Sequence, residues 1–70
     1  MLAMPALRKR SLSLEGHRTS LALEPEFWAA LDGIAARRAV SLPQLIGEID
    51  AARGARALAS ACRVFALATR

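Results

Sequence analysis

The sequence predicts a mainly α-helical fold with one short strand region near its start. From Ser11 to Leu23, apolar residues alternate with polar ones, and this period of two is typical of a β-strand. After Glu24, apolar residues recur at every third or fourth position in three successive segments, which is the period of an amphipathic helix. With 70 residues, the chain has room for one small domain.

The strand region has two different faces. One face is apolar or nearly so, and the other is polar or small: Thr19, Leu21 and Leu23 against Arg18, Ser20 and Ala22. Glu15-Gly16 could form a tight turn, because glycine tolerates a positive φ. Such a turn would place Leu14 opposite His17 and Leu12 opposite Thr19. The pattern therefore allows a hairpin without requiring one.

The chain begins with a short segment that shows no clear period and ends in Arg8-Lys9-Arg10. We expect a mobile basic arm over residues 1–10, followed by a folded domain over residues 11–70. The basic triplet could hold DNA phosphates, and a solvated tail without function is an equally good interpretation.

The first predicted helix starts at Glu24-Pro25-Glu26, since proline and acidic residues suit the first turn. It runs to about Arg38 and carries Phe27, Trp28, Leu31, Ile34 and Ala35. The second starts at Ser41, which can cap it, with Gln44 completing a capping box. Its apolar stripe is Leu42, Leu45, Ile46 and Ile49. A third, alanine-rich helix is predicted over residues 55–70, with the stripe Leu58, Ala61, Cys62 and Phe65.

A second copy of the chain is the predicted source of stability. So short a chain usually needs a disulfide, a metal or a partner subunit. The single cysteine, Cys62, and the single histidine, His17, provide neither an internal disulfide nor a metal cluster, so we expect no cofactor. A lone strand cannot persist in water, and pairing with its copy in a homodimer would satisfy it. The predicted dimer core is Leu21, Leu23, Phe27, Trp28, Leu31, Ile34, Leu45, Ile46 and Ile49.

The charge favours a nucleic-acid partner. The net charge is +4 and the isoelectric point is near 11.1, and nine of the ten basic residues are arginine. Arginine has a forked donor array that suits phosphates and guanine edges. No stretch is long enough to span a membrane, no secretory signal is evident, and no nucleophile, base or carboxylate pair is arranged for catalysis. We expect a non-enzymatic cytoplasmic protein.

Several of these residues together resemble a known family. The segment Gly16 to Ser20, the pair Phe27-Trp28 and Ser41 before Leu45-Ile46 look like a ribbon-helix-helix DNA-binding domain of a short bacterial subfamily. The resemblance covers about residues 10–70, with the predicted third helix added at its end. It implies a homodimeric transcriptional regulator, such as a repressor, that inserts an antiparallel β-ribbon into the major groove of DNA.

The resemblance also implies residue roles. Alternate strand residues would read bases, namely Arg18, Ser20 and Ala22. The start of the second helix, Ser41 with the amides from Leu42 onward, would hold a phosphate. Two residues depart from the family pattern. Ala22 can offer only a methyl contact to thymine, and Ala39 or Val40 stands where the family often has glycine between its helices.

A protein-interaction module is the alternative function. It could be an antitoxin whose third helix binds a toxin, or a dimer that has lost DNA binding. A hairpin packed beside the ribbon would widen a dimer's sheet to four strands, which fit poorly in a groove about 12 Å wide. Exposure of Val64 and Leu67 would favour a protein partner through the third helix.

Overall fold

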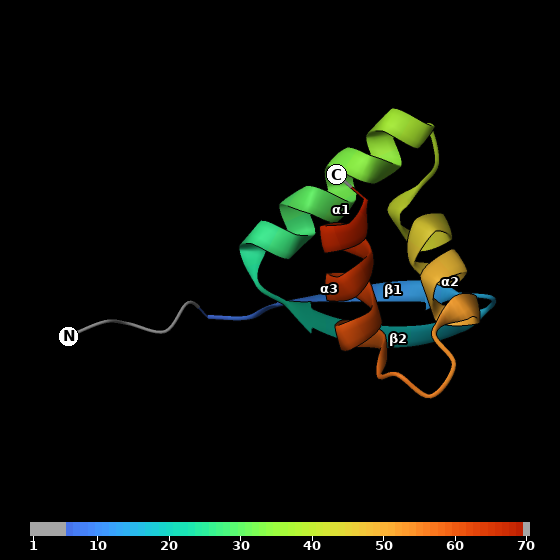
Figure 1. Cartoon of the computed structure of the whole chain (residues 1–70). Helices are drawn as coiled ribbons and strands as arrows, with labels where there is room; N and C mark the ends of the chain where they lie inside the picture. Colours follow the sequence, from blue (N-terminus) through green and yellow to red (C-terminus); the bar gives the residue numbers. More distant parts are fainter. Residues whose placement is uncertain (1–5, 70) are drawn as a thin grey trace.

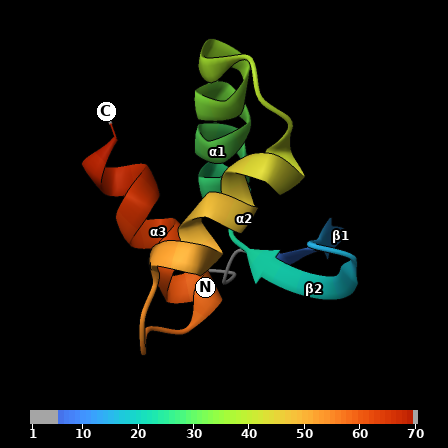
Figure 2. The same ribbon diagram turned by 90° about the vertical axis from the view of Figure 1, so that its right-hand side faces the viewer.

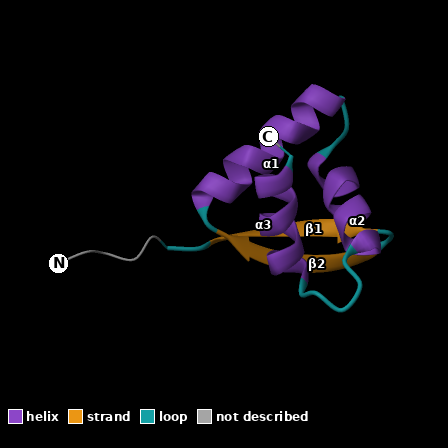
Figure 3. Cartoon of the chain, in the orientation of Figure 1, coloured by secondary structure: helices purple, strands orange, loops and turns teal. Residues whose placement is uncertain are grey.

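The computed structural model describes residues 6–69 and contains a two-stranded antiparallel sheet followed by three helices. The strands are β1 (Arg8–Leu14) and β2 (His17–Leu23). The helices are α1 (Pro25–Arg38), α2 (Leu42–Ala52) and α3 (Leu58–Ala68). All three helices lie on one side of the hairpin (Figures 1, 2 and 3). The predicted fold class, a short strand region followed by helices, is confirmed.

The hairpin that the sequence allowed is formed. Glu15 and Gly16 connect the strands with φ values of 50° and 81°. Positive φ at both central residues is typical of the tight turns whose twist matches that of paired strands. The register places Leu14 opposite His17 and Leu12 opposite Thr19, as predicted for this turn.

The expectation that residues 1–10 form an arm before the fold is wrong for Arg8, Lys9 and Arg10, which belong to β1. Residues 1–5 lie outside the described part of the chain. Backbone pairing with Leu23, Ala22 and Leu21 holds the basic triplet in the sheet. Side chains of α1 add two contacts. The Trp28 Nε1–H donates to the Arg8 carbonyl at 2.8 Å, and Arg10 donates two hydrogen bonds of 3.1 Å to the Asp32 carboxylate.

The connection between α1 and α2 turns at Ala39, whose φ of 56° and ψ of 40° lie in the left-handed region. The next amide, Val40 N–H, donates to the Ala35 carbonyl at 3.0 Å and closes the end of α1. This is the position where the resemblance led us to expect glycine. An alanine there carries a steric cost that glycine would not.

We therefore expect Ala39→Gly to stabilise the protein. The relief of left-handed strain, about 1–2 kcal/mol, outweighs the added freedom of glycine in the unfolded chain, about 0.4–1 kcal/mol. Urea unfolding should show a net gain of roughly 0.5–1 kcal/mol. The matched control is Ala36→Gly, inside α1, which should destabilise by a similar amount. A loss of stability in Ala39→Gly would contradict the account of this turn.

Helix α2 begins as the sequence predicts, with the Ser41 hydroxyl accepting from the Gln44 amide at 3.1 Å. Helix α3 is shorter than expected. It starts at Leu58, because Gly54 takes a positive φ of 61° and residues 53–57 form a loop after α2. In that loop the Arg53 guanidinium donates to the Arg56 carbonyl at 2.8 Å.

The hydrophobic core is complete within a single chain. Helix α3 packs on α1, α2 and β2, while α2 also packs on β1. Leu23, Leu31, Leu45, Ile46 and Cys62 are all fully buried. Of the residues predicted for a dimer core, every one except the half-buried Phe27 is buried within one chain. The argument that an unpaired strand needs a second copy fails here, since β1 pairs with β2.

Candidate nucleic-acid interface

The side of the hairpin that faces away from the helices carries small, polar and basic side chains. The register places Lys9 opposite Ala22, Ser11 opposite Ser20, and Ser13 opposite Arg18. All six are exposed except Ala22, which is half-buried. The intervening residues face the helices, and Leu12, Leu21 and Leu23 among them are buried. We call Lys9, Ser11, Ser13, Arg18, Ser20 and Ala22 the outer face.

The outer face is electropositive. Neither strand contains an acidic residue, and the nearest one along the chain is Glu15 in the turn. Lys9 and Arg18 lie near opposite ends of the face, on different strands, about 13 Å apart along the strand direction. Among residues 6–69, no ion pair involves either of them. Both charges are therefore available to an external anion.

Four other arginines, one of them Arg10 of β1, are held differently. Within the described chain, Arg38 pairs with Glu48 at 2.8 Å and Arg53 with Asp50 at 2.6 Å. Arg63 pairs with Glu24 at 2.8 Å and Arg10 with Asp32 at 3.1 Å. Because acids neutralise these four cations, the excess positive charge is weighted toward the strands.

Two of these arginines also stack on aromatic rings of α1. The Arg10 guanidinium carbon lies 4.4 Å from the Trp28 ring centroid, and that of Arg63 lies 5.8 Å from the Phe27 ring centroid. Each arginine also donates two hydrogen bonds to one carboxylate. These contacts fasten β1 and α3 to α1, so Arg10 is a structural residue rather than a free phosphate ligand.

The ion pair between Arg63 and Glu24 makes the stability of the fold depend on pH. The hydrogen bonds from Arg63, and then a backbone hydrogen bond, lower the pKa of the Glu24 carboxyl below its ordinary value. A carboxyl with a lowered folded-state pKa stabilises the fold above its unfolded-state pKa and loses this contribution as pH falls through the folded-state value.

We expect Glu24→Gln to reduce the unfolding free energy at neutral pH and to have less effect at a pH well below the ordinary carboxyl pKa. Urea unfolding at both pH values measures the difference. Glu26→Gln is the matched control, since Glu26 is an exposed acid at the same helix start. An equal effect of Glu24→Gln at both pH values would show that its charge does not matter.

The predicted phosphate site at the start of α2 is only partly available. The Ser41 hydroxyl already accepts from the Gln44 amide, and the Leu45 amide donates to the Ser41 carbonyl at 3.0 Å. Pro43 has no N–H, so Leu42 provides the remaining first-turn amide. Pro43 and Gln44 line a shallow hollow with Ser13 at the β1 edge. The start of α2 thus flanks the hairpin, but it offers an anion few donors.

Sequence reasoning identified part of the outer face. It named Arg18, Ser20 and Ala22, which the structure places together, and it named Lys9 as a phosphate contact on a mobile arm. It missed Ser11 and Ser13, and it did not place Lys9 in a strand beside β2. Lys9, Ser11 and Ser13 also alternate with residues that face the helices. The turn register contained this information, since a two-residue turn at Glu15-Gly16 fixes which β1 residues share a face with Arg18.

The single cysteine of the chain lies in the core. Burial raises the pKa of the Cys62 thiol to about 11, with Asp50 adding to this effect, so at neutral pH the thiol stays protonated inside the core. Residues 6–69 contain no cluster of three or more metal-binding side chains. None of their helices is long and apolar enough to cross a membrane.

Comparison with known proteins gives one match. A family model described as a ribbon-helix-helix domain matches residues 7–69, which is nearly the whole chain. A search of curated proteins and a search of solved structures each found no match. The matched segment includes both strands of the hairpin and all three helices.

Proposed function

The chain belongs to the ribbon-helix-helix family, and from this we propose that it is a DNA-binding transcriptional regulator that contacts DNA with the outer face of its hairpin. Domains of this family are typically non-enzymatic and belong to DNA-binding regulators or antitoxins, which generally bind DNA as dimers. The more specific role of a repressor rests on the family resemblance alone.

One observation carries the proposal. A two-stranded ribbon presents six small, polar or basic residues on a face without acids, and the two cations on it are free of ion pairs within the described chain. Base edges and phosphates are recognised by arginine, lysine and hydroxyl groups. The small side chains of the serines also allow the ribbon backbone to lie close to the base edges in the major groove.

The width of the sheet decides how the ribbon would enter DNA. Pairing of β2 with β2 of a second copy would give four strands, with the outer two about 14 Å apart. The major groove is about 12 Å wide. The hairpin of one chain, with strands about 4.8 Å apart, fits that groove. We therefore replace the expected ribbon of two β2 strands with the hairpin of a single chain, one hairpin for each half-site.

Residue roles follow from position on this ribbon. Arg18 would donate to a guanine edge, and Ser20 with Ser11 opposite it would reach neighbouring bases. Ala22 would touch a thymine methyl group. Lys9, Arg8 and the Leu42 amide would contact phosphates at the borders of the hairpin. Arg10 is assigned no DNA contact, because Asp32 and Trp28 already hold it.

The test is selection of binding sites from random-sequence DNA, followed by affinity measurements at two salt concentrations. We expect a preferred sequence to emerge and the affinity to fall steeply with salt. The log–log slope should be about −4 to −7, corresponding to roughly four to eight phosphate contacts per dimer. Absence of binding at low salt, or binding with no preferred sequence, would contradict the proposal.

A protein-interaction function is the second candidate, and one observation favours it. On α3, Val64 is 44% exposed and Leu67 is 54% exposed, and the two lie three residues apart on the helix. A contiguous exposed apolar patch is typical of a protein-interaction site. A protein such as a toxin could cover them. If so, Val64→Glu should abolish binding of that protein and leave DNA affinity unchanged. Loss of both functions together would indicate a folding defect.

A further inference from the structure

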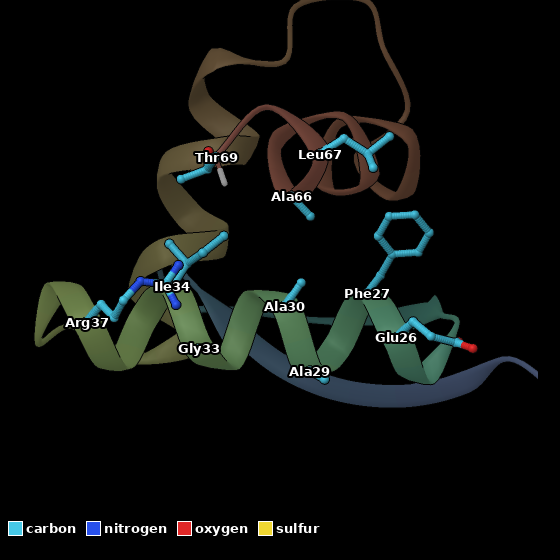
Figure 4. A pocket seen from close by; sticks show the side chains of 10 residues that line it. All are labelled: Glu26, Phe27, Ala29, Ala30, Gly33, Ile34, Arg37, Ala66, Leu67 and Thr69. Atoms are coloured by element: carbon cyan, nitrogen blue, oxygen red, sulfur yellow. The ribbon is translucent and has the colours of Figure 1, made fainter.

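An apolar groove of about 450 Å³ runs between α1 and α3 on the helical layer. Figure 4 shows Phe27 and Ala30 of α1 facing Ala66 and Leu67 of α3 across it. Leu67, on the α3 wall, is more than half exposed. Binding sites for small molecules have volumes of about 300–1,000 Å³, apolar walls and a few well-placed polar groups. The volume and the walls of this groove fit that description.

The charged groups of the groove lie at its two ends. Arg37 and Thr69 line the end where α1 stops, and Glu26 lines the opposite end. Figure 4 shows the Arg37 side chain turned back along α1, so that its guanidinium lies beside Ile34 on the side of Thr69. Among residues 6–69, no ion pair involves Arg37. The groove thus has an unpaired cation at one end and an acid at the other.

Gly33 allows the Arg37 guanidinium to lie along the groove. An added Cβ at Gly33 would lie 3.4 Å from the Arg37 Nη1 atom, which is already van der Waals contact. A longer side chain at this position would therefore displace the guanidinium and fill the space beside it. Because glycine inside a helix lowers its stability relative to alanine, a role in keeping the groove open gives a reason for glycine here.

We propose that this groove binds a free carboxylate with an unbranched alkyl chain of medium length, such as decanoate. The carboxylate accepts two hydrogen bonds from the Arg37 guanidinium, a geometry that arginine favours. The alkyl chain lies between Ala30 and Ala66 and points toward Phe27. Phe27 and Arg37 are ten residues apart on α1, so about 15 Å of groove separates them. Glu26, next to Phe27, repels an anion and so disfavours the reverse orientation.

The arrangement of charge favours a small anionic molecule over a protein segment. One cation at the end of an apolar groove matches a single carboxylate on an apolar chain. Leu67 lines this groove, whereas Val64 lines the hollow between α2 and α3, so variants at the two positions distinguish the two kinds of partner. Neither strand contributes to the lining, so binding in the groove can be measured without DNA and whether or not the proposed function holds.

The first experiment is isothermal titration calorimetry with decanoate and with decanol, which has the same chain without the charge. Decanoate is expected to bind the unmodified protein about tenfold more tightly than decanol, because hydrogen bonds to a charged group are stronger. Arg37→Ala should remove that difference, and Arg37→Lys should restore part of it. Shortening the chain to octanoate should weaken binding about two- to fourfold for each methylene removed. Absence of decanoate binding below the concentration at which it forms micelles would overturn the proposal.

Control variants separate the groove from general attraction to a basic protein. Arg56→Ala removes an exposed arginine that has no ion pair among residues 6–69, and it should leave decanoate binding unchanged. Val64→Glu should leave it unchanged as well. Equal losses in Arg37→Ala and Arg56→Ala would overturn the proposal. So would an affinity for decanoate that falls as the protein concentration rises, because a second copy of the chain would then cover the groove.

The second experiment tests the shape of the groove while folding is monitored. Gly33→Leu should abolish binding of both decanoate and decanol, because its side chain fills the groove and displaces Arg37. Its melting temperature without ligand should stay the same or rise, since leucine is a better helix former than glycine. Gly47→Leu in α2, where an added Cβ meets nothing, is the matched control and should bind decanoate normally. Decanoate binding that survives Gly33→Leu would overturn the proposal.

Discussion

Replacing Trp28 with alanine is expected to unfold much of the protein at room temperature. Trp28 is 2% exposed, and its Nε1–H donates to the Arg8 carbonyl at 2.8 Å while Arg10 stacks on its ring. Removing a buried tryptophan side chain costs about 3–5 kcal/mol. A core of this size supplies roughly 3–5 kcal/mol of net stability. The loss is therefore comparable to the whole stability of the fold, and circular dichroism with urea unfolding measures it.

Trp28→Phe separates the hydrogen bond from the packing. Phenylalanine keeps most of the apolar contact and leaves the Arg8 carbonyl without its donor, which should cost about 1–2 kcal/mol. Amide hydrogen exchange should then show the start of β1 opening more readily than β2. Val64→Ala, at an exposed position on α3, is the control and should change stability little. A small effect of Trp28→Ala would mean that α1 does not anchor β1.

Arg18→Ala is expected to give the largest loss of DNA recognition. Arg18 is exposed on the outer face opposite Ser13 and has no ion-pair partner within residues 6–69. A bidentate contact with guanine is worth about 1–3 kcal/mol of discrimination. Affinity for the selected site should fall by about 5- to 150-fold, with much less change on unrelated DNA. Fluorescence anisotropy on both DNA molecules measures the two losses.

Two control variants each remove one positive charge from another position of the protein. Lys9→Ala should weaken binding to all sequences alike and make the salt slope shallower by about 1 for each chain bound. Arg56→Ala removes an exposed arginine from the loop between α2 and α3 and should have little effect. If Arg18→Ala weakens binding equally on every sequence, then Arg18 contacts phosphate and does not read bases.

The helices and the turn were predictable because their signals are local. Ser41 caps α2 through the Gln44 amide, and Glu15-Gly16 forms the turn with the expected register. The positive φ at Ala39 agrees with the glycine that the family resemblance implied there. For the cap and the turn, the cause lies within a few residues of the position that it explains, so one sequence is enough to predict them.

The start of β1 was missed because its stabilising contacts are distant in sequence. Arg8 and Arg10 face the helices as charged residues, so the strand shows no apolar alternation there. Arg10 is tolerated because Asp32 and the Trp28 ring, more than 17 residues further along the chain, receive its guanidinium. No local pattern in residues 1–10 predicts that Asp32 and Trp28 will contact Arg10.

The same omission changed the expected site. Without β1, the sequence predicted that the strand needs a second copy and that only Arg18, Ser20 and Ala22 read bases. With β1 paired, the core closes in one chain, and the face doubles to include Lys9, Ser11 and Ser13. Base reading, phosphate contact and dimer formation remain predictions, since each concerns a partner outside the chain.

The outer face is tested most directly by titrating the isotopically labelled protein with its selected DNA and following the backbone amide signals by NMR. We expect the largest shifts at Lys9, Ser11, Ser13, Arg18, Ser20 and Ala22, with smaller ones at Leu42. The buried Ile46 and the exposed Val64 should change little. Shifts concentrated on α3 or along the groove between α1 and α3, with the hairpin signals unmoved, would contradict the assignment of the hairpin as the DNA-binding surface.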